Sequence, residues 1–269
     1  MKLRVFVILV AVSLLSIGCA TVPMTGRSQL ALVPEADMVT AASQNYDEFL
    51  GTVKVSDDPA ANALVGRIGE RVAASAEKFL TDLDMTSDLR FYDWRFTVVD
   101  DDETVNAFCM PGGKIVVYSG IIPVAETEDQ LAVVIGHEVA HALARHSSER
   151  MSQILLAELG GMALARAIQE KPRETQGWLM LAYGMGAQLG VILPYSRTHE
   201  KEADRIGLIL MAQAGYDPRA AVPFWSRMSE LGGARPPEFL STHPAPATRI
   251  EEIEGYMPEA LRYYEASQE

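Results

Sequence analysis

The pentapeptide His137-Glu138-Val139-Ala140-His141 constrains the fold more than any other feature of the chain. Two histidines four residues apart lie on the same side of an α-helix, so both imidazole rings can reach one metal ion. The chain has only five histidines, which makes a chance HExxH pattern improbable. Imidazole is a good zinc ligand, and a catalytic zinc keeps one position for water. The pattern therefore predicts a helix that carries zinc ligands His137 and His141, with Glu138 activating the water.

The third zinc ligand has to come from elsewhere in the sequence. One class of HExxH enzymes uses a histidine six residues after the second one, but Ser147 stands there, and Ala144 replaces the usual intervening glycine. A second class uses a glutamate followed four residues later by an aspartate. Glu158 lies in the corresponding region, but Met162 stands in the aspartate position. Neither spacing supplies the ligand.

A better candidate is the segment from Glu200 to Asp204, which reads Glu-Lys-Glu-Ala-Asp on a predicted helix. Glu200 and Asp204 share one side of that helix, one turn apart. We expect Glu200 to bind zinc and Asp204 to accept the outer N–H of a ligand histidine, which fixes its tautomer. Without HExxH, these carboxylates would be interpreted as exposed helix charges. His146, which a continuous helix would place opposite His137, is left out of the metal site, and His199 is interpreted as structural.

The hydrophobic pattern predicts a small sheet inserted among many helices, an α+β fold that is mostly α. Apolar residues recur with a helical period from Pro34 to about Leu80, and again from Thr127 onward, which predicts a helix as far as Ile168. Thr127 and Gln130 form a capping box at the start of the HExxH helix. Strands are expected around 94–99, 106–108 and 115–118, with a hairpin turn at 111–113, and further helices at about 196–213, 218–231 and 247–265.

The apolar stretch from Trp178 to Leu193 contains no charged residue. Its sixteen residues are interrupted by three glycines and fall short of a membrane-spanning helix. We expect a buried helix, or a flap that covers the cleft beside the metal.

The N-terminal residues resemble a secretory signal. Lys2 and Arg4 precede an apolar run from Val5 to Leu15, which is too short to span a bilayer, and small residues lead into Cys19. This pattern resembles the lipidation site of bacterial lipoproteins, so we expect Cys19 to carry lipid. Cys109 then has no intramolecular partner, which excludes a disulfide framework. Ala20 is not the aspartate associated with inner-membrane retention, so the outer membrane is favoured.

The net charge of the chain is −13, with a pI near 4.9. Nucleic-acid binding requires clustered Lys and Arg, so an acidic chain argues against nucleic acid as a partner.

Taken together, four segments resemble peptidase family M48, over nearly the whole chain after the signal. These segments are NAFCMPGG (106–113), HEVAHALARH (137–146), SRTHEKEAD (196–204) and the Thr-His-Pro and Arg positions within 242–249. The resemblance implies a gluzincin-type fold with a small sheet beside the HExxH helix, one Zn²⁺ per chain, and His137, His141 and Glu200 as its ligands. The chain is similar to the short lipoprotein branch of this family.

The resemblance also implies roles for three other residues. His243 matches a histidine that can approach the zinc, either as a fourth ligand that blocks the water position or as a donor to the developing oxyanion. Arg249 matches an arginine near the same site. Asn106 begins the strand that pairs with an extended substrate. Cys109 is interpreted as a packing residue.

The expected function is that of a zinc metalloendopeptidase of the bacterial envelope, anchored on the periplasmic side and acting on unfolded or misassembled envelope proteins. The expected organisation is a signal peptide (1–18), a lipid-anchored tether (19–35) and a metallopeptidase domain (36–269). The alternative is a chaperone for outer-membrane protein assembly, with catalysis latent or silenced.

Overall fold

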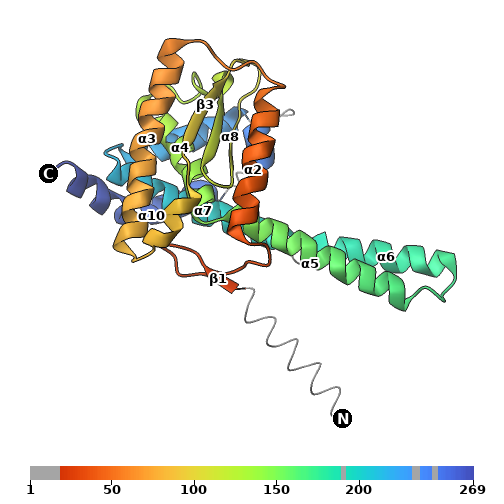
Figure 1. Cartoon of the computed structure of the whole chain (residues 1–269). Helices are drawn as coiled ribbons and strands as arrows, with labels where there is room; N and C mark the ends of the chain where they lie inside the picture. Colours follow the sequence, from red (N-terminus) through yellow and green to blue (C-terminus); the bar gives the residue numbers. More distant parts are fainter. Residues whose placement is uncertain (1–18, 189–191, 232–236, 244–247) are drawn as a thin grey trace.

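The computed structural model describes residues 19–188, 192–231, 237–243 and 248–269, and the expected signal peptide lies outside this range. Helices surround a small sheet (Figure 1), which confirms the expected mostly helical α+β fold. The helices are α2 (Glu35–Leu50), α3 (Pro59–Asp82), α4 (Glu128–Leu143), α5 (His146–Ala167), α6 (Arg173–Ala187), α7 (Leu193–Gln213), α8 (Ala221–Leu231), α9 (Glu238–Thr242) and α10 (Arg249–Ser267). The strands are β1 (Cys19–Thr21), β2 (Ser28–Leu30), β3 (Arg95–Val99), β4 (Ala107–Met110) and β5 (Lys114–Tyr118), and short 3-10 turns lie at Thr86–Phe91, Ser119–Ile121 and Pro218–Ala220.

Helix α4 lies at the centre of the body. Thirteen of its sixteen residues are buried, so this helix is apolar on nearly all sides, as expected of a core helix. It begins as the capping pattern predicts, because the Thr127 hydroxyl accepts the Gln130 N–H at 3.2 Å. Helices α3 and α7 pack against it, and α10 packs on α7. The metal-binding motif therefore sits on the most enclosed element of the fold.

The main sheet has the strand order β3-β5-β4. Strand β5 pairs parallel to β3 and antiparallel to β4. The expected hairpin turn between β4 and β5 is present, with positive φ at both Gly112 and Gly113. The two faces of the sheet alternate: Ile115 and Val117 join the main core beneath α3 and α4, whereas Val116 packs with Tyr46 of α2 on the other face. Strand β4 is left at the edge of the sheet.

The long helix expected from Thr127 to Ile168 is wrong, because the chain breaks after α4. Arg145 adopts a left-handed conformation, with φ 55° and ψ 37°, and a new helix, α5, starts at His146. Propensity alone did not reveal this break, since alanine, leucine and arginine all favour helix. The turn redirects α5 away from the body.

Helices α5 and α6 form a hairpin that projects from the body as an arm (Figure 1). The part of the apolar segment 178–193 that belongs to α6 packs on α5, has no buried residue and does not line the metal-site cleft, so both the buried helix and the flap are wrong for those residues. Positions 189–191 of that segment lie outside the described residues. Pro194 does not end a helix but lies in the first turn of α7, where its missing N–H is not needed. Within the described part of the chain, no helix is both long enough and apolar enough to cross a bilayer.

The segment expected to be a tether begins with a small antiparallel hairpin. Strand β1 pairs with β2, and the chain then runs along the start of α5. Two backbone N–H groups bond to α5 side chains there: Leu30 to Glu149 at 3.3 Å and Leu32 to Ser152 at 3.0 Å. The N-terminal segment is thus packed on the root of the arm, and the sequence analysis did not predict these strands.

Candidate metal centre

A close crossing of α4 and α7 brings the two motif helices together. A Cβ atom on Gly136 would lie 2.9 Å from the carbonyl oxygen of Gly207, and one on Gly207 would lie 2.9 Å from the backbone nitrogen of His137. Side chains at either position would push the helices apart, so glycine permits the backbone contact. Beside this crossing, His137 and His141 of α4 face Glu200 of α7.

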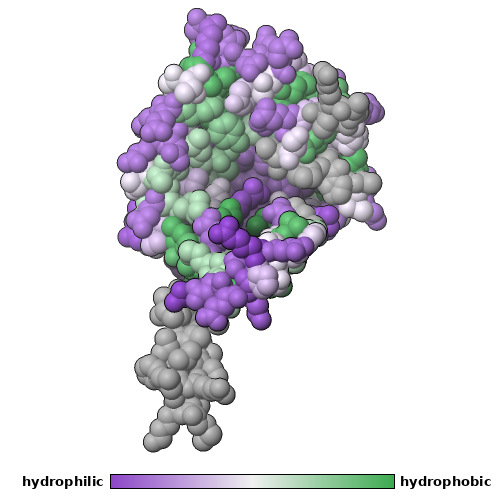
Figure 2. Space-filling model, turned by 90° about the vertical axis from the view of Figure 1, so that its right-hand side faces the viewer, coloured by the Kyte–Doolittle hydropathy of each residue, from purple (hydrophilic) through white to green (hydrophobic). Residues whose placement is uncertain are grey.

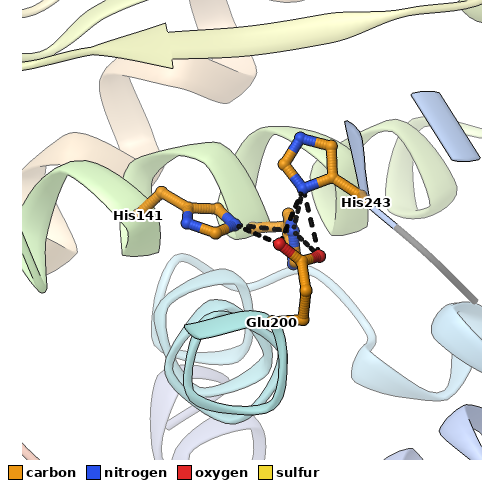
Figure 3. A group of neighbouring side chains, drawn as sticks. His141, Glu200 and His243 are labelled. Carbon is orange, nitrogen blue, oxygen red and sulfur yellow. Dashed lines mark hydrogen bonds and ion pairs between the residues drawn. The ribbon is translucent and has the colours of Figure 1, made fainter. Parts of the chain in front are cut away.

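Four potential ligand atoms converge at this place. Side-chain atoms of His137, His141, Glu200 and His243 all lie within 4.8 Å of one another. The Nε2 atom of His137 is 3.0 Å from Nε2 of His141 and 3.1 Å from Nδ1 of His243. A Glu200 carboxylate oxygen lies 3.1 Å from His243 Nδ1. Figure 3 shows the three labelled side chains pointing toward one another from α4, α7 and the segment after α9.

The outer nitrogen atoms of the two helix histidines are already engaged. His137 Nδ1 lies 3.0 Å from the carboxylate of Asp204, the contact expected of that aspartate. His141 Nδ1 lies 2.8 Å from Nδ1 of His146, whose Nε2 lies 3.0 Å from Glu202. If His146 donates to that carboxylate, its Nδ1 accepts the N–H of His141. Both Nε2 atoms then present lone pairs to each other.

Two lone pairs at 3.0 Å repel unless a proton or a metal ion lies between them, and the convergence of four ligand atoms fits a bound metal. The electrostatics agree. Although burial lowers it, hydrogen bonds to Asp204 and Glu200 raise the pKa of His137 to about 9. The carboxylates therefore favour positive charge at this position, and a donor set of imidazoles and a carboxylate suits zinc.

Glu138 lies beside the cluster and is almost fully buried. Its Oε1 atom has no hydrogen-bond partner among the described residues and lies 3.4 Å from Nε2 of His243. Burial raises the pKa of this carboxyl group above its usual range, while the nearby histidines oppose the shift. A buried carboxylate with an uncommitted oxygen is able to accept a proton from a water molecule.

Arg249 lies behind the cluster rather than in the cleft. Its guanidinium group donates to both oxygens of Asp204, at 2.7 and 2.8 Å, and to the carbonyl of His243 at 3.2 Å. The group also stacks over Trp225, with the central carbon 3.4 Å from the ring centroid. Arg249 therefore holds Asp204, the hydrogen-bond partner of His137, and the backbone that carries His243.

His243 follows a single turn of helix, α9, which the sequence analysis did not predict. Its N–H donates to the carbonyl of Phe239 at 2.8 Å, and Phe239 is fully buried against Trp225. The buried Phe239 thus holds the backbone of His243 in place. Pro244, the last residue of the Thr-His-Pro pattern, lies outside the described residues.

A network that sequence reasoning missed supports His141 from the far side. His146, which the expected continuous helix placed away from the site, turns back to His141 because the chain breaks at Arg145. His199 stacks on His146 with the ring centroids 4.3 Å apart and bonds to Glu149 at 2.8 Å. On a continuous helix, the spacing of His141 and His146 does not predict this contact, which depends on the break at Arg145.

Arg27, from the turn between β1 and β2, completes this network. Its guanidinium group donates to Glu149 at 2.7 Å and to Glu202 at 2.8 Å. Burial alone would raise the pKa of both carboxyl groups, but the hydrogen bonds from Arg27 and from the histidines lower each to about 2. The N-terminal hairpin is therefore linked through two buried carboxylates to a residue in contact with His141.

A cleft of about 330 Å³ opens onto the cluster. Glu138, His141, Glu200 and His243 line it on one side, and Phe108 and Cys109 of the edge strand β4 line it on another. Cys109 is packed against the core, and burial raises the pKa of its thiol. Asn106 precedes β4 and is buried, and its side-chain oxygen accepts the N–H of Ala107 at 2.9 Å. Asn106 therefore lies at the start of the strand, and Phe108 and Cys109 are the β4 residues at the cleft.

Two histidines and one glutamate are the metal-ligand set of a well-defined class of metallopeptidases. The buried HExxH helix, packed against the helix of Glu200 and Asp204, brings together the same kinds of side chain in this protein. Comparison with known sequences then gives the family: the pattern of peptidase family M48 matches residues 59–257. The chain belongs to peptidase family M48, which confirms the resemblance and the expected metalloendopeptidase class.

Relatives agree with this assignment. The chain is 42% identical over 176 residues to the mitochondrial metalloendopeptidase OMA1 of Schizosaccharomyces pombe, covering 65% of this chain and 49% of that protein. It is 30% identical over 254 residues to human OMA1, covering 90% of this chain and 47% of that protein. It is 26% identical over 239 residues to the beta-barrel assembly-enhancing protease of Escherichia coli, covering 86% of this chain and 46% of that protein. The chain spans about half the length of these relatives.

Proposed function

We propose that the protein is a zinc-dependent endopeptidase in which His137, His141 and Glu200 hold the metal and Glu138 is the general base. The observation that carries the proposal is the uncommitted, buried oxygen of Glu138 next to four converging ligand atoms. When bound, zinc supplies a Lewis acid that polarises a carbonyl and lowers the pKa of water toward about 7.

The residues of the chain would carry out the remaining steps. Glu138 takes a proton from the attacking water and delivers it to the leaving amine. The edge strand β4 offers unpaired backbone groups beside the cleft, which favours an extended substrate that adds as another strand. Asp204 fixes the tautomer of His137, and Arg249 holds Asp204 in place. Arg249 is thus proposed as a positioning residue, while Asn106 would act by starting the substrate-binding strand.

His243 is proposed to control access to the metal. Its Nδ1 atom lies among the ligand atoms, which supports a fourth ligand in the position that water needs. Its Nε2 atom points to Glu138, which supports the rival version, a donor to the developing oxyanion. Both versions place His243 at the reacting centre, and its replacement distinguishes them.

The substrates of a peptidase are polypeptides, and we propose unfolded or misassembled envelope proteins. The signal-like sequence before Cys19 supports the bacterial envelope, and one bacterial relative is described as a beta-barrel assembly-enhancing protease. The proposed organisation is a signal peptide (1–18), a lipid-anchored segment (19–35) and the peptidase domain (36–269). Cys19 is exposed at the start of β1, where a lipid would meet no steric obstacle from the core.

Mass spectrometry of the mature N-terminus tests the anchor. A diacylglyceryl adduct on Cys19 is expected. An unmodified N-terminus at another residue would show that the protein is not anchored in this way.

A second candidate function is binding without cleavage, as a chaperone for outer-membrane protein assembly. The placement of His243 among the ligand atoms favours it, because a permanent fourth ligand would silence catalysis. Zinc analysis followed by proteolysis of an unfolded protein, with and without Glu138→Gln, separates the two. Cleavage that disappears in the variant supports the peptidase; binding of unfolded protein without any cleavage supports the chaperone.

A further inference from the structure

The arm made by α5 and α6 exposes an unusual amount of apolar surface. Of the thirteen large apolar residues that are exposed among the described ones, nine lie on this arm. Met162 and Trp178 are 61% and 66% exposed. Exposed apolar surface gathered in one place marks a binding surface more often than a structural feature. Figure 2, which looks from the side to which the arm points, shows hydrophobic patches among hydrophilic ones on this face.

Between the two helices runs an apolar groove of about 620 Å³. Glu158 is the only charged residue among the eleven that line it, and the others include Ile154, Met162, Met180 and Tyr183. Methionine side chains adapt to ligands of different shape. The groove is therefore suited to varied apolar side chains and not to one rigid ligand.

The groove and the catalytic cleft meet at one residue of α5. Ile154 lines both the groove and the cleft, and Met151, one turn earlier on α5, also lines the cleft. A chain that occupies the groove is thus led toward the metal cluster along α5. A bilayer surface would contact the outside of the arm but has no reason to follow a groove that ends at the peptidase site.

The charge of the arm also favours an apolar polypeptide segment as the ligand. Residues 150–188 carry four basic and three acidic side chains, whereas the whole chain has a net charge of −13. The arm is therefore nearly neutral on an acidic protein. A largely apolar groove on a nearly neutral arm selects for apolar segments, which folded proteins bury and unfolded ones expose.

We propose that the α5–α6 groove is a second substrate-binding site that holds an apolar segment of an unfolded polypeptide while another part of the same chain lies in the catalytic cleft. The proposal rests on the proposed peptidase function and names the feature by which substrates are selected. From His146 to Ala165 the helix rises about 28 Å, which an extended chain covers with about eight or nine residues. Peptides of six residues cannot reach both sites.

The test compares a long and a short substrate in two matched variants. Met162→Glu places a charge in the groove, whereas Leu156→Glu places one on the same helix at a side chain 53% exposed and outside the groove lining. The substrates are β-casein, an unfolded protein, and a fluorogenic hexapeptide. Met162→Glu is expected to raise KM for β-casein about tenfold, because an apolar segment cannot satisfy a buried charge. Hexapeptide cleavage by this variant and both activities of Leu156→Glu should stay within about twofold of the parent.

Equal losses for both substrates, or equal effects of the two variants, would overturn the proposal. The affinity of labelled β-casein for the inactive Glu138→Gln protein, measured with and without Met162→Glu, gives a second test of the groove. If neither β-casein nor the hexapeptide is cleaved, the proposed function fails, yet the loss of β-casein binding still tests the groove. If Met162→Glu abolishes binding to phosphatidylethanolamine–phosphatidylglycerol vesicles and leaves β-casein binding intact, the arm binds lipid and the proposal is wrong.

Discussion

Replacing Arg27 with alanine is expected to weaken zinc binding, although Arg27 lies outside the ligand cluster and precedes the residues matched by the family pattern. The guanidinium group contacts Glu149 and Glu202, whose side chains are 0% and 5% exposed. Those carboxylates hold His199 and His146, and His146 contacts His141. Without Arg27, two buried carboxylates lose their cation, and the tautomer of His141 loses its support.

The size of the effect follows from burial. Removing one partner of a fully buried ion pair costs about 3–5 kcal/mol. Since Arg27 is 22% exposed and water can partly replace it, we expect a loss of about 2–3 kcal/mol in the free energy of unfolding. For a chain of this size that lowers Tm by about 4–12 °C. Zinc affinity should fall about 10–100-fold, the usual effect of losing a residue that orients a ligand.

The stabilisation is also pH-dependent. Because the pKa values of Glu149 and Glu202 are lowered from 4.5 to about 2 in the folded protein, their contribution is complete above about pH 4.5 and is lost as the pH falls toward 2. In Arg27→Ala the two pKa values rise, so the stability lost over this range should be smaller than in the parent protein.

The assay is thermal unfolding of the metal-free protein together with zinc competition against a chromogenic chelator. Arg205→Ala is the control, since Arg205 makes a similar double contact with Glu259, and neither residue is among the four that converge on the metal position. The control should lower stability only slightly and leave zinc affinity unchanged. If Arg27→Ala behaves like the control, the link between the N-terminal hairpin and His141 has no energetic importance.

Three further substitutions test the cluster itself. Glu200→Ala should lose most bound zinc, measured by metal analysis, and full stoichiometry would mean that another residue is the third ligand. His243→Ala should keep zinc and cleave unfolded protein faster if His243 blocks the water position, or lose roughly a hundredfold in rate if it stabilises the oxyanion; loss of zinc would contradict both. Gly207→Ala should lower Tm and zinc affinity because its Cβ meets the backbone of His137, whereas Gly66→Ala, with open space around it, should be neutral or stabilising.

Local patterns in the sequence predicted much of the fold. The HExxH spacing, the Thr127 cap and the two glycines of the β4–β5 turn each act within a few residues, and the structure contains the helix, the cap and the hairpin. The two motif helices also meet, although no local pattern states which helices pack together. The chemistry of a shared metal ion implied that contact.

Other features depend on tertiary contacts that no local pattern encodes. The left-handed residue at Arg145 was invisible because its neighbours favour helix, and with it the contact of His146 with His141 was missed. Arg27 lies more than a hundred residues from Glu149 and Glu202, its two partners. From sequence alone, the apolar residues of α6 resemble those of a buried helix. Hydrophobicity indicates that a surface is covered by something apolar, but it does not distinguish the protein core from a bound ligand.

The most direct test of the central claim is the rate of peptide cleavage by Glu138→Gln, measured with its zinc content. The amide has nearly the size of the carboxylate but cannot accept a proton from water. We expect one zinc per chain, an unchanged Tm within about 2–3 °C, and a loss of cleavage of at least about a hundredfold, at the lower end of the contribution of a general base. Cleavage at a near-normal rate by the zinc-loaded variant would contradict the assignment of Glu138 as the general base and with it the proposed mechanism.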